Sequence, residues 1–276
     1  MVTSSTPDDA LRTSLLELAR ATAEEAAQLV GAGRSTTADH VDTKSSPVDV
    51  VTAVDRASEA LIVARLLEAR PDDAVLGEEG ASREGTSGVR WVVDPIDGTV
   101  NFLYGLPAFA ISIAAEVDGR TEVGVVLDVA TGELFTAVRG GGAWLTAPGA
   151  AAQQLTGSRA AELSRALVAT GFGYASEQRR AQGAVVARLL PEVRDIRRVG
   201  CASLDLCSAA AGRVDAYYEQ GLKPWDHAAG ALVAAEAGLV VTGTSGRPFA
   251  EPVAVAAAPG VAAALVALLE ELGAGS

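Results

Sequence analysis

The segment that most constrains this chain is residues 91–102, Trp-Val-Val-Asp-Pro-Ile-Asp-Gly-Thr-Val-Asn-Phe, where an apolar strand runs directly into Asp94 and Asp97. Pro95 fixes the backbone φ angle between the two carboxylates and limits the bend, so both side chains can converge on one point. The Ile96 carbonyl, free of any strand ladder, can add a third oxygen. Carboxylate and carbonyl oxygens suit Mg²⁺, Ca²⁺ or Mn²⁺ and do not suit zinc.

The two residues that follow, Gly98 and Thr99, favour an anion site beside this cation site. Their backbone N–H groups would lie at a helix N-terminus, where phosphate binds readily. A cation site next to an anion site is what phosphoryl chemistry requires. The alternative interpretation is a capped turn, because Asp-Pro and Asp-Gly are ordinary turn dipeptides.

Two other segments carry carboxylates beside apolar runs. In Gly77–Gly80, one of Glu78 and Glu79 could reach a metal ion while the other faces solvent, but taken alone this segment is better interpreted as a solvated loop. Asp226 opens an Ala-rich helix and fits an N-cap, which could still ligate a metal with its second oxygen. We interpret His227 as structural, because no second histidine lies near it in the sequence.

A fourth segment, residues 44–55, places Asp55 on the same helical face as Val51 and Ile62. A carboxylate on an apolar stripe is costly unless it is paired, and a Thr hydroxyl is a natural partner. The alternative is that the helix is rotated differently about its axis, so that Asp55 is a charge on the surface.

Composition excludes several classes of protein. The 276 residues are 49% hydrophobic and 21% charged, which is typical of a globular chain, and no apolar run is long enough to predict a membrane helix. A net charge of −13 argues against nucleic acid as a main partner, although a local basic patch of Arg194, Arg197 and Arg198 could remain. Cys201 and Cys207 are expected to be buried free thiols, which favours a reducing, cytoplasmic compartment. The excess of Arg over Lys, with abundant Ala and Gly, is typical of a GC-rich bacterial genome.

Hydrophobic periodicity predicts an α+β half over residues 1–150 and an α/β half over residues 151–276, with a linker at 148–153. The first half should contain helices at 8–31 and 50–70 around a loop at 35–49, and then a mixed or antiparallel sheet. Its strands are expected at Ala74–Gly77, Val89–Asp94, Ala108–Val117, Val123–Val129 and Glu133–Val138. In the second half, strands and helices should alternate, with helices at 176–190, 202–212, 226–238 and 260–272.

Together these segments resemble the inositol monophosphatase family over about residues 10–270. One family signature is present as Asp94-Pro95-Ile96-Asp97-Gly98-Thr99, and the second is present as Trp225-Asp226 followed by Ala228-Ala229-Gly230. Gly200-Cys201-Ala202 and Tyr217-Tyr218-Glu219 look like the family's inositol-binding part. Cys201 departs from the more usual Ser or Thr, and we expect little consequence.

The resemblance implies a layered αβαβα sandwich of the sugar phosphatase superfamily, a homodimer, and Mg²⁺-dependent, lithium-sensitive hydrolysis of a small phosphorylated polyol. It assigns a first metal to Glu78, Asp94 and the Ile96 carbonyl, and a second metal to Asp94, Asp97 and Asp226. Thr99, hydrogen-bonded to Asp55, would orient the attacking water together with Glu78, and Lys44 would support the site from behind the ligands. Phosphate would be bound by the Gly98 and Thr99 N–H groups, and the polyol by Asp97, Arg197, Ala202, Glu219 and Asp226.

Hydrolysis of myo-inositol monophosphate by metal-activated water is therefore the expected activity. The chain has no candidate phosphohistidine and no Cys-x5-Arg loop for a thiolate mechanism. Fructose-1,6-bisphosphate, histidinol phosphate or a 3′-phosphonucleotide are alternative substrates for the same chemistry. A regulatory protein that binds a partner through this fold is the alternative from another class.

Overall fold

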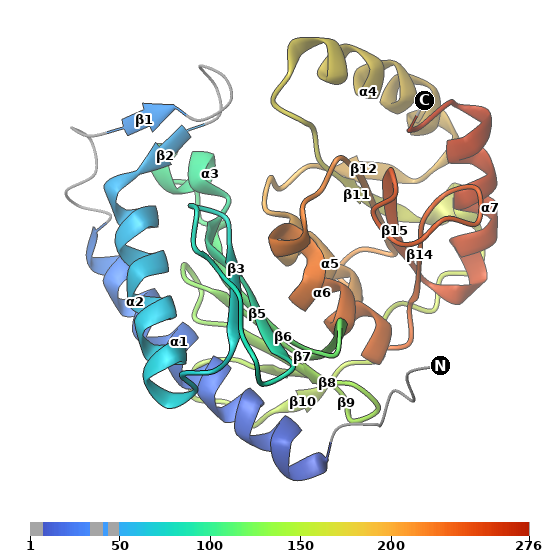
Figure 1. The fold of residues 1–276 in the computed structure, drawn as a ribbon. Coiled ribbons are helices and arrows are strands. Elements are labelled where there is room, and N and C mark those ends of the chain that lie inside the picture. Colours follow the sequence, from blue (N-terminus) through green and yellow to red (C-terminus); the bar gives the residue numbers. More distant parts are fainter. Residues whose placement is uncertain (1–7, 34–40, 44–49, 276) are drawn as a thin grey trace.

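The computed structural model describes residues 8–33, 41–43 and 50–275, and Figure 1 shows their arrangement. The helices are α1 (Asp9–Gly33), α2 (Ala53–Ala69), α3 (Thr99–Tyr104), α4 (Ser176–Leu189), α5 (Ala202–Ala210), α6 (Pro224–Glu236) and α7 (Pro259–Glu271), with short 3-10 turns at Leu163–Arg165 and Leu190–Glu192. No described helix has the length and apolar character needed to cross a membrane.

The larger sheet has the strand order β10-β9-β8-β7-β6-β5-β3-β4. Its strands are β3 (Ala74–Gly77), β4 (Ser82–Arg83), β5 (Val89–Asp97), β6 (Ala110–Val117), β7 (Arg120–Asp128), β8 (Leu134–Val138), β9 (Gly142–Thr146) and β10 (Gln153–Gln154). Only the β3–β5 pair is parallel among these strands. The sheet is therefore mixed, as the close spacing of the strands predicts.

The smaller sheet has the order β12-β11-β13-β15-β14. Its strands are β11 (Leu167–Thr170), β12 (Asp195–Arg197), β13 (Ala216–Gln220), β14 (Val240–Thr242) and β15 (Val253–Ala257). β11 pairs in parallel with β12 and with β13, and these connections contain helices, as βαβ crossovers require.

The two sheets and the helices form five layers, visible from left to right in Figure 1. Helices α1 and α2 bury Leu15 and Ile62 against the outer face of the larger sheet, where Trp91 and Val93 point. The opposite face of β5 presents Val92 to a middle layer made of α5 and α6. Helices α4 and α7 close the outer face of the smaller sheet. This arrangement confirms the expected αβαβα sandwich.

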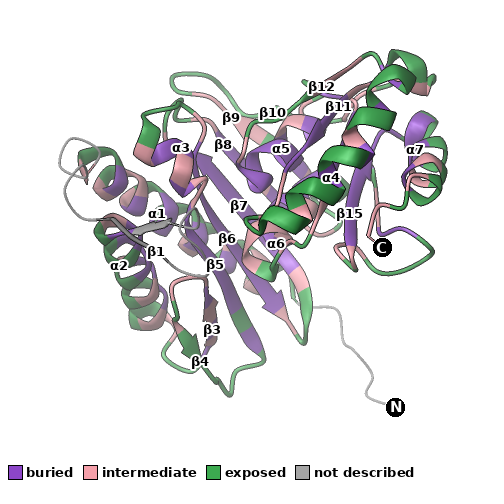
Figure 2. Cartoon of the chain, turned by 90° about the horizontal axis from the view of Figure 1, so that it is seen from above, coloured by how far each residue is buried: buried purple, intermediate pink, exposed green. Residues whose placement is uncertain are grey.

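Small residues allow the middle layer to approach the larger sheet closely. A Cβ atom at Gly124 of β7 would lie 2.8 Å from the Ala229 carbonyl oxygen, and one at Gly230 would lie 3.0 Å from the Leu206 side chain. The Ala-Ala-Gly run in α6 therefore brings the start of that helix against the sheet. Figure 2 shows that the central strands β5, β6 and β7 are mostly buried, while the edge strand β4 and the outward face of α4 are exposed.

Three local expectations differ from the structure. Residues 50–52 form β2 (Val50–Thr52) and pair with β1 (Val41–Thr43), so α2 starts at Ala53, with Thr52 as its N-cap, and part of the expected loop is a strand. The β-branched run at 50–52 favours a strand, and the Thr52 side chain accepts N–H groups that would otherwise lack partners. The expected linker at 148–153 ends in β10, which pairs with β9.

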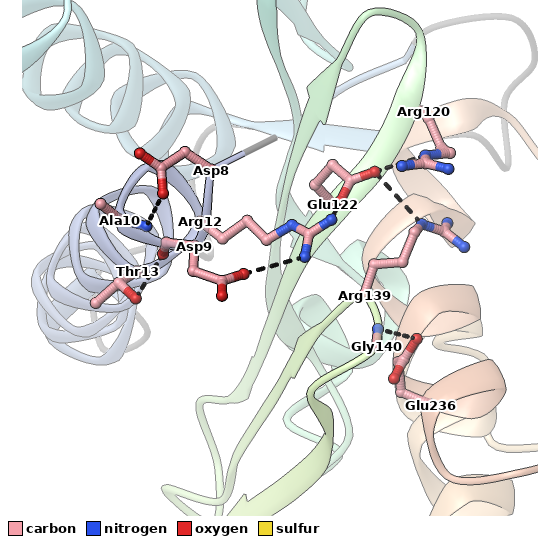
Figure 3. A network of polar contacts seen from close by, with 10 residues as sticks. All are labelled: Asp8, Asp9, Ala10, Arg12, Thr13, Arg120, Glu122, Arg139, Gly140 and Glu236. Atoms are coloured by element: carbon pink, nitrogen blue, oxygen red, sulfur yellow. Dashed lines mark hydrogen bonds and ion pairs between the residues drawn. The ribbon is translucent and has the colours of Figure 1, made fainter. Parts of the chain in front are cut away.

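One buried carboxylate in the larger sheet is surrounded by arginines, as Figure 3 shows. The Glu122 side chain on β7 is fully buried. Its Oε1 lies 2.6 Å from Arg120 Nε and 3.7 Å from Arg139 Nε, and its Oε2 lies 2.9 Å from Arg12 Nη2. Arg12 comes from α1, so this cluster joins the first helix to the sheet.

Candidate active site

A cavity of about 580 Å³ lies where the ends of β3, β5 and β13 meet the N-terminal ends of α3, α5 and α6. It brings together nine of the residues predicted from the sequence, drawn from positions more than 100 apart. They are Glu78, Asp94, Ile96, Asp97, Gly98, Thr99, Ala202, Glu219 and Asp226. Lys44 lies outside the described residues.

The end of β5 delivers two of the carboxylates. Pairing between β5 and β6 is regular up to Asp94, skips Pro95 and Ile96, and returns at Asp97. Within this irregularity Asp94 Oδ1 accepts the Ile96 N–H at 3.0 Å, and the Asp94 side chain is buried. The interruption of the ladder leaves the Ile96 carbonyl to accept the Thr99 hydroxyl at 3.0 Å, and a carbonyl oxygen has a second lone pair that could bind another group.

Asp97 is held by the N-terminus of α5. Its Oδ2 accepts the Ser203 N–H at 2.7 Å, and the Ser203 hydroxyl, the Cys201 thiol and the Ala202 N–H also donate to the carboxylate. Burial raises the pKa of Asp97, and these hydrogen bonds partly oppose the rise. The contact joins a carboxylate from β5 to a helix of the second half of the chain.

Asp226 is not the N-cap of α6, which corrects the expectation from the sequence. The N-cap is Lys223, Pro224 occupies the first turn, and Asp226 is the third helical residue. Its Oδ2 accepts the Lys223 N–H at 2.7 Å, which leaves Oδ1 without a partner from the backbone at the helix start. The helix begins earlier because proline is favoured at the first helical position, where its fixed φ is already helical.

The loop that carries Glu78 is fixed by a residue that the sequence analysis missed. The buried Glu59 on α2 accepts the Glu79 N–H at 2.8 Å and the Ala81 N–H at 2.9 Å. A Cβ atom at Gly77 would lie only 2.2 Å from Glu59 Oε2, so glycine is needed there. The signal was available in the sequence, because Glu59 lies four residues after Asp55 and so shares its helical face.

That face of α2 also supports the turn after β5. Asp55 Oδ1 accepts the Thr99 hydroxyl at 2.9 Å, and Asp55 Oδ2 accepts the N–H and the hydroxyl of Thr52. Ser58 donates to the Pro95 carbonyl at 3.1 Å. Asp55 is fully buried, so it is the paired carboxylate that its place on an apolar stripe indicates, and its Thr partners are Thr52 and Thr99.

The carboxylates of the cavity repel one another. The pKa of Asp94 is raised well above its ordinary value, first by burial and then by the charges of Glu78, Asp97 and Asp226. Burial and the Asp97 charge likewise raise the pKa of Asp226 well above its usual range. Among the described residues, Asp94, Asp97 and Asp226 form no ion pair with a lysine or arginine.

This donor set fits a hard divalent cation. Buried carboxylates that face one cavity without a basic partner need a positive charge from outside the described chain. In the described residues, no group of three or more His, Cys, Asp or Glu side chains is arranged to hold a metal ion by itself. Mg²⁺ remains compatible with this lining, because it keeps several waters and takes only one or two carboxylates in many sites.

The opposite wall of the cavity contains Glu219 on β13. Its Oε2 accepts the hydroxyl of the buried Tyr217 at 2.8 Å. Burial raises the pKa of Glu219 to about 7, the Tyr217 hydrogen bond lowers it, the Asp97 charge raises it, and Arg198 lowers it. This carboxylate therefore titrates near neutral pH.

The arginine in the cavity wall is Arg198 and not the predicted Arg197. Arg197 ends β12 as an exposed residue and donates to Asp195 Oδ2 at 2.6 Å and to the Ile196 carbonyl at 2.8 Å. Arg198 follows the strand, and its guanidinium carbon lies 6.0 Å from the centroid of the Phe172 ring. Arg198, the first residue after the strand, is thus the arginine that lines the cavity.

The remaining side chains behave as the sequence suggests. Cys201 and Cys207 are free and buried, and burial raises the pKa of both thiols well above the usual range. His227 packs edge-on against Phe249, with 5.3 Å between ring centroids, and burial lowers its pKa to about 4. A neutral buried imidazole agrees with a structural role.

A five-layered sandwich with carboxylates and helix N-termini around one cavity defines a phosphatase architecture. The model of the inositol monophosphatase family matches residues 11–274. Inositol-1-monophosphatase SuhB of Mycobacterium tuberculosis is 49% identical over 252 residues, covering 88% of this chain and 86% of that protein. The Nus factor SuhB of Escherichia coli K12 is 42% identical over 234 residues, covering 84% and 86%.

The solved structures agree with these sequences. Mycobacterium tuberculosis SuhB has a TM-score of 0.83 at 45% identity and covers 96% of this chain and 99% of its own. An inositol monophosphatase from Thermotoga maritima also has a TM-score of 0.83, at 30% identity, with 96% and 98% covered. This chain belongs to the inositol monophosphatase family, a family of metal-dependent phosphatases.

Proposed function

We propose that this protein hydrolyses myo-inositol monophosphate to inositol and phosphate and requires Mg²⁺. The observation that carries the proposal is the group of buried carboxylates facing the Gly98–Thr99 backbone across one cavity. A phosphate monoester is an anion that repels hydroxide, and its uncatalysed hydrolysis is extremely slow. A site for this reaction therefore has to combine cation ligands with N–H donors, as this cavity does.

Glu78, Asp94 and the Ile96 carbonyl would hold one Mg²⁺, and Asp94, Asp97 and Asp226 a second. When bound, the metal ions would neutralise phosphate charge, activate a water molecule and stabilise the leaving alkoxide. The chain's part is to hold the ligands in place. Ser203 fixes Asp97, Lys223 fixes one oxygen of Asp226, and the Ile96 N–H fixes Asp94.

Thr99 would orient the attacking water. Both oxygens of Asp55 are occupied, with Thr52 on Oδ2 and the Thr99 hydroxyl on Oδ1. Because Thr99 directs its only hydroxyl proton toward Asp55 and the Ile96 carbonyl, its oxygen lone pairs can accept a hydrogen bond from water. Glu78 lines the same cavity and would accept the second hydrogen bond that fixes the water.

The substrate would span the cavity between two walls. The Gly98 and Thr99 N–H groups at the start of α3 would bind phosphate, and Gly98 has the positive φ of 92° that this turn requires. The polyol hydroxyls would meet Ala202, Glu219 and Asp226 on the opposite wall. Arg198, which the structure places in this wall, replaces Arg197 in the proposal.

The expected division into residues 1–150 and 151–276 also enters the proposal. Apart from β10, which lies after residue 150 and pairs with β9, each sheet belongs to one half. Residues of both halves line the cavity, so we propose that neither half is active alone. A cytoplasmic location and a homodimer complete the proposal, the former from the free thiols and the latter from the family resemblance.

A panel of phosphate esters tests the function. We expect the highest kcat/KM for myo-inositol 1-phosphate, ahead of fructose-1,6-bisphosphate, histidinol phosphate and a 3′-phosphonucleotide. Excess EDTA should abolish phosphate release, and Li⁺ should inhibit it in the presence of Mg²⁺. Full turnover in EDTA would overturn the metal dependence, and a higher kcat/KM for another ester would replace the substrate.

A second candidate function is partner binding, which the 42% identity to a protein named Nus factor SuhB favours. Such a role would use the surface of the molecule and would survive loss of the cavity's chemistry. Binding of a transcription-complex protein that Asp94→Asn leaves unchanged would support it. Phosphate release without any such binding would leave the enzyme as the sole function.

A further inference from the structure

Asn101 lies on α3, two residues after Thr99, and is the polar residue of the 91–102 segment to which the proposed chemistry gives no role. Its side chain is 3% exposed. The Asn101 Nδ2 atom lies 2.8 Å from the Ala108 carbonyl oxygen, 3.0 Å from that of Val199 and 3.2 Å from that of Gly200. Its two hydrogens are therefore shared among three acceptors.

These acceptors come from both halves of the chain. Ala108 precedes β6 of the larger sheet, whereas Val199 and Gly200 form the loop between β12 and α5. One buried amide thus ties the helix after the phosphate-binding turn to the loop that continues into Cys201 and Ala202. A buried amide that met only one of these carbonyls would leave the others without a donor, which is costly.

The backbones at this junction are already in close contact. A Cβ atom at Gly98 would lie 2.9 Å from the Ala108 carbonyl oxygen and 3.3 Å from the Cys201 Cβ atom. Gly200 has a φ of 88°, which disfavours any residue with a side chain. The phosphate-binding turn and the polyol-facing loop therefore touch, and Asn101 joins them in addition to the contact between Asp97 and Ser203.

We propose that Asn101 is a positioning residue. It fixes the position of the phosphate wall of the cavity, formed by Gly98 and Thr99, relative to the polyol wall, which includes Ala202 and Glu219. This inference rests on the proposed function for its kinetic consequence. The hydrolysis rate of a small substrate held at both ends depends on the relative position of the two walls, because a displacement of about 1 Å can lower the rate about 100-fold. An ester without hydroxyl groups uses only the phosphate wall and should respond less.

The test compares Asn101→Asp, which keeps the shape of the side chain but replaces the donating amide nitrogen with an oxygen, with the wild-type protein. We expect kcat/KM for myo-inositol 1-phosphate to fall about 100-fold, and the ratio of this value to that for p-nitrophenyl phosphate to fall at least tenfold. Ser87→Ala is the control, because it removes a partly buried hydrogen bond to Asp73, and neither residue lines the cavity. It should lower stability without changing the ratio. An unchanged ratio in Asn101→Asp would overturn the proposal.

Amide hydrogen exchange gives a readout that does not depend on activity. Exchange over residues 199–203 should be at least tenfold faster in Asn101→Asp than in the wild type, and unchanged in Ser87→Ala. If the wild-type protein hydrolyses neither ester, the proposed function fails and the exchange result alone decides the role of Asn101. If Asn101→Asp does not fold, Asn101→Ala and Gly200→Ala disturb the same junction from its two sides. Unchanged exchange in the variants that fold would overturn the proposal.

Discussion

Two buried acidic regions of this molecule differ in where their positive charge comes from. Glu122 is fully buried, and three arginines from α1, β7 and the end of β8 surround it (Figure 3). Asp94 is equally buried, but its nearest charges are Glu78, Asp97 and Asp226. The first region has its counter-charges within the chain, whereas the second has no ion pair with an arginine or lysine of the described residues, and we propose that a bound cation supplies its counter-charge.

The difference separates a structural carboxylate from a functional one. Removing one partner of a buried ion pair costs about 3–5 kcal/mol, because a charge remains without compensation. If the proposed metal ion binds in the cavity, the repulsion between its carboxylates would be relieved and would contribute to the affinity for that ion. Changes in the two regions should therefore affect different properties of the protein.

The largest expected effect is the loss of catalytic activity caused by Asp94→Asn. Asp94 is proposed to contact both metal ions, so the variant should lower kcat/KM for myo-inositol 1-phosphate by about 10⁴-fold, or about 5 kcal/mol. Steady-state kinetics at saturating Mg²⁺ measure this. A loss below tenfold would remove Asp94 from the reaction.

Glu122→Ala should instead destabilise the fold by about 3 kcal/mol, since it removes the fully buried carboxylate that Arg12, Arg120 and Arg139 surround and leaves Arg12 with only its 3.5 Å contact to the exposed Asp9. For a chain of this size each kcal/mol lowers Tm by about 2–4 °C. The kinetic constants of the folded variant should stay close to those of the wild type. Arg65→Ala, which removes an exposed ion pair with Glu25, is the control and should change Tm little. A variant that melts like the wild type would show that the arginine cluster contributes nothing.

Some of the contacts in these two regions can be predicted from the sequence and others cannot. The 91–102 segment predicts its own cation and anion sites because the residues are adjacent, and the period of 3.6 places Asp55 on a buried face. The sequence does not predict that Arg12 contacts Glu122 or that Asn101 contacts Val199, because those contacts join positions about 100 residues apart and depend on how the layers pack.

The expectation that Asp226 is the N-cap of α6 is wrong for a different reason. A carboxylate next to an apolar helix reads as an N-cap, yet Pro224 starts the helix two residues earlier and places Asp226 at the third position. Likewise, alternation along β12 could not tell whether Arg197 or Arg198 enters the cavity, because the strand ends between them.

Thr99→Ala should lower kcat by about 100-fold and change KM less than about threefold, because the hydroxyl is assigned to orienting water. Its backbone N–H, which is assigned to phosphate, survives the substitution. Initial rates over a range of substrate concentrations separate the two constants. An unchanged kcat with a large rise in KM would mean that Thr99 only binds substrate.

Glu219→Gln should change how stability depends on pH. The folded-state pKa of Glu219 is about 7, above its ordinary value of 4.5, so the folded state holds the proton more tightly than the unfolded state. The carboxylate therefore lowers stability progressively as pH rises from about 4.5 to about 7. The variant lacks this penalty and should gain up to about 2 kcal/mol on the wild type across that range.

Melting curves of both proteins between pH 5 and pH 8 measure the gain. The opposite pH effect of His227, whose pKa is lowered to about 4, is the same in both proteins and cancels in the difference. A constant difference in Tm across this range would show that Glu219 is not buried as a charge.

The cation requirement of the cavity is tested most directly by thermal melts of the wild type, Asp94→Asn and Glu122→Ala, each in EDTA and in saturating Mg²⁺. A cation that binds only the folded state adds about 2.7 kcal/mol at a hundredfold excess over Kd, which raises Tm by roughly 5–10 °C. We expect this rise in the wild type and in Glu122→Ala, and a much smaller one in Asp94→Asn. An equal rise in all three proteins would place the stabilising ion elsewhere and would contradict the cavity as a metal site.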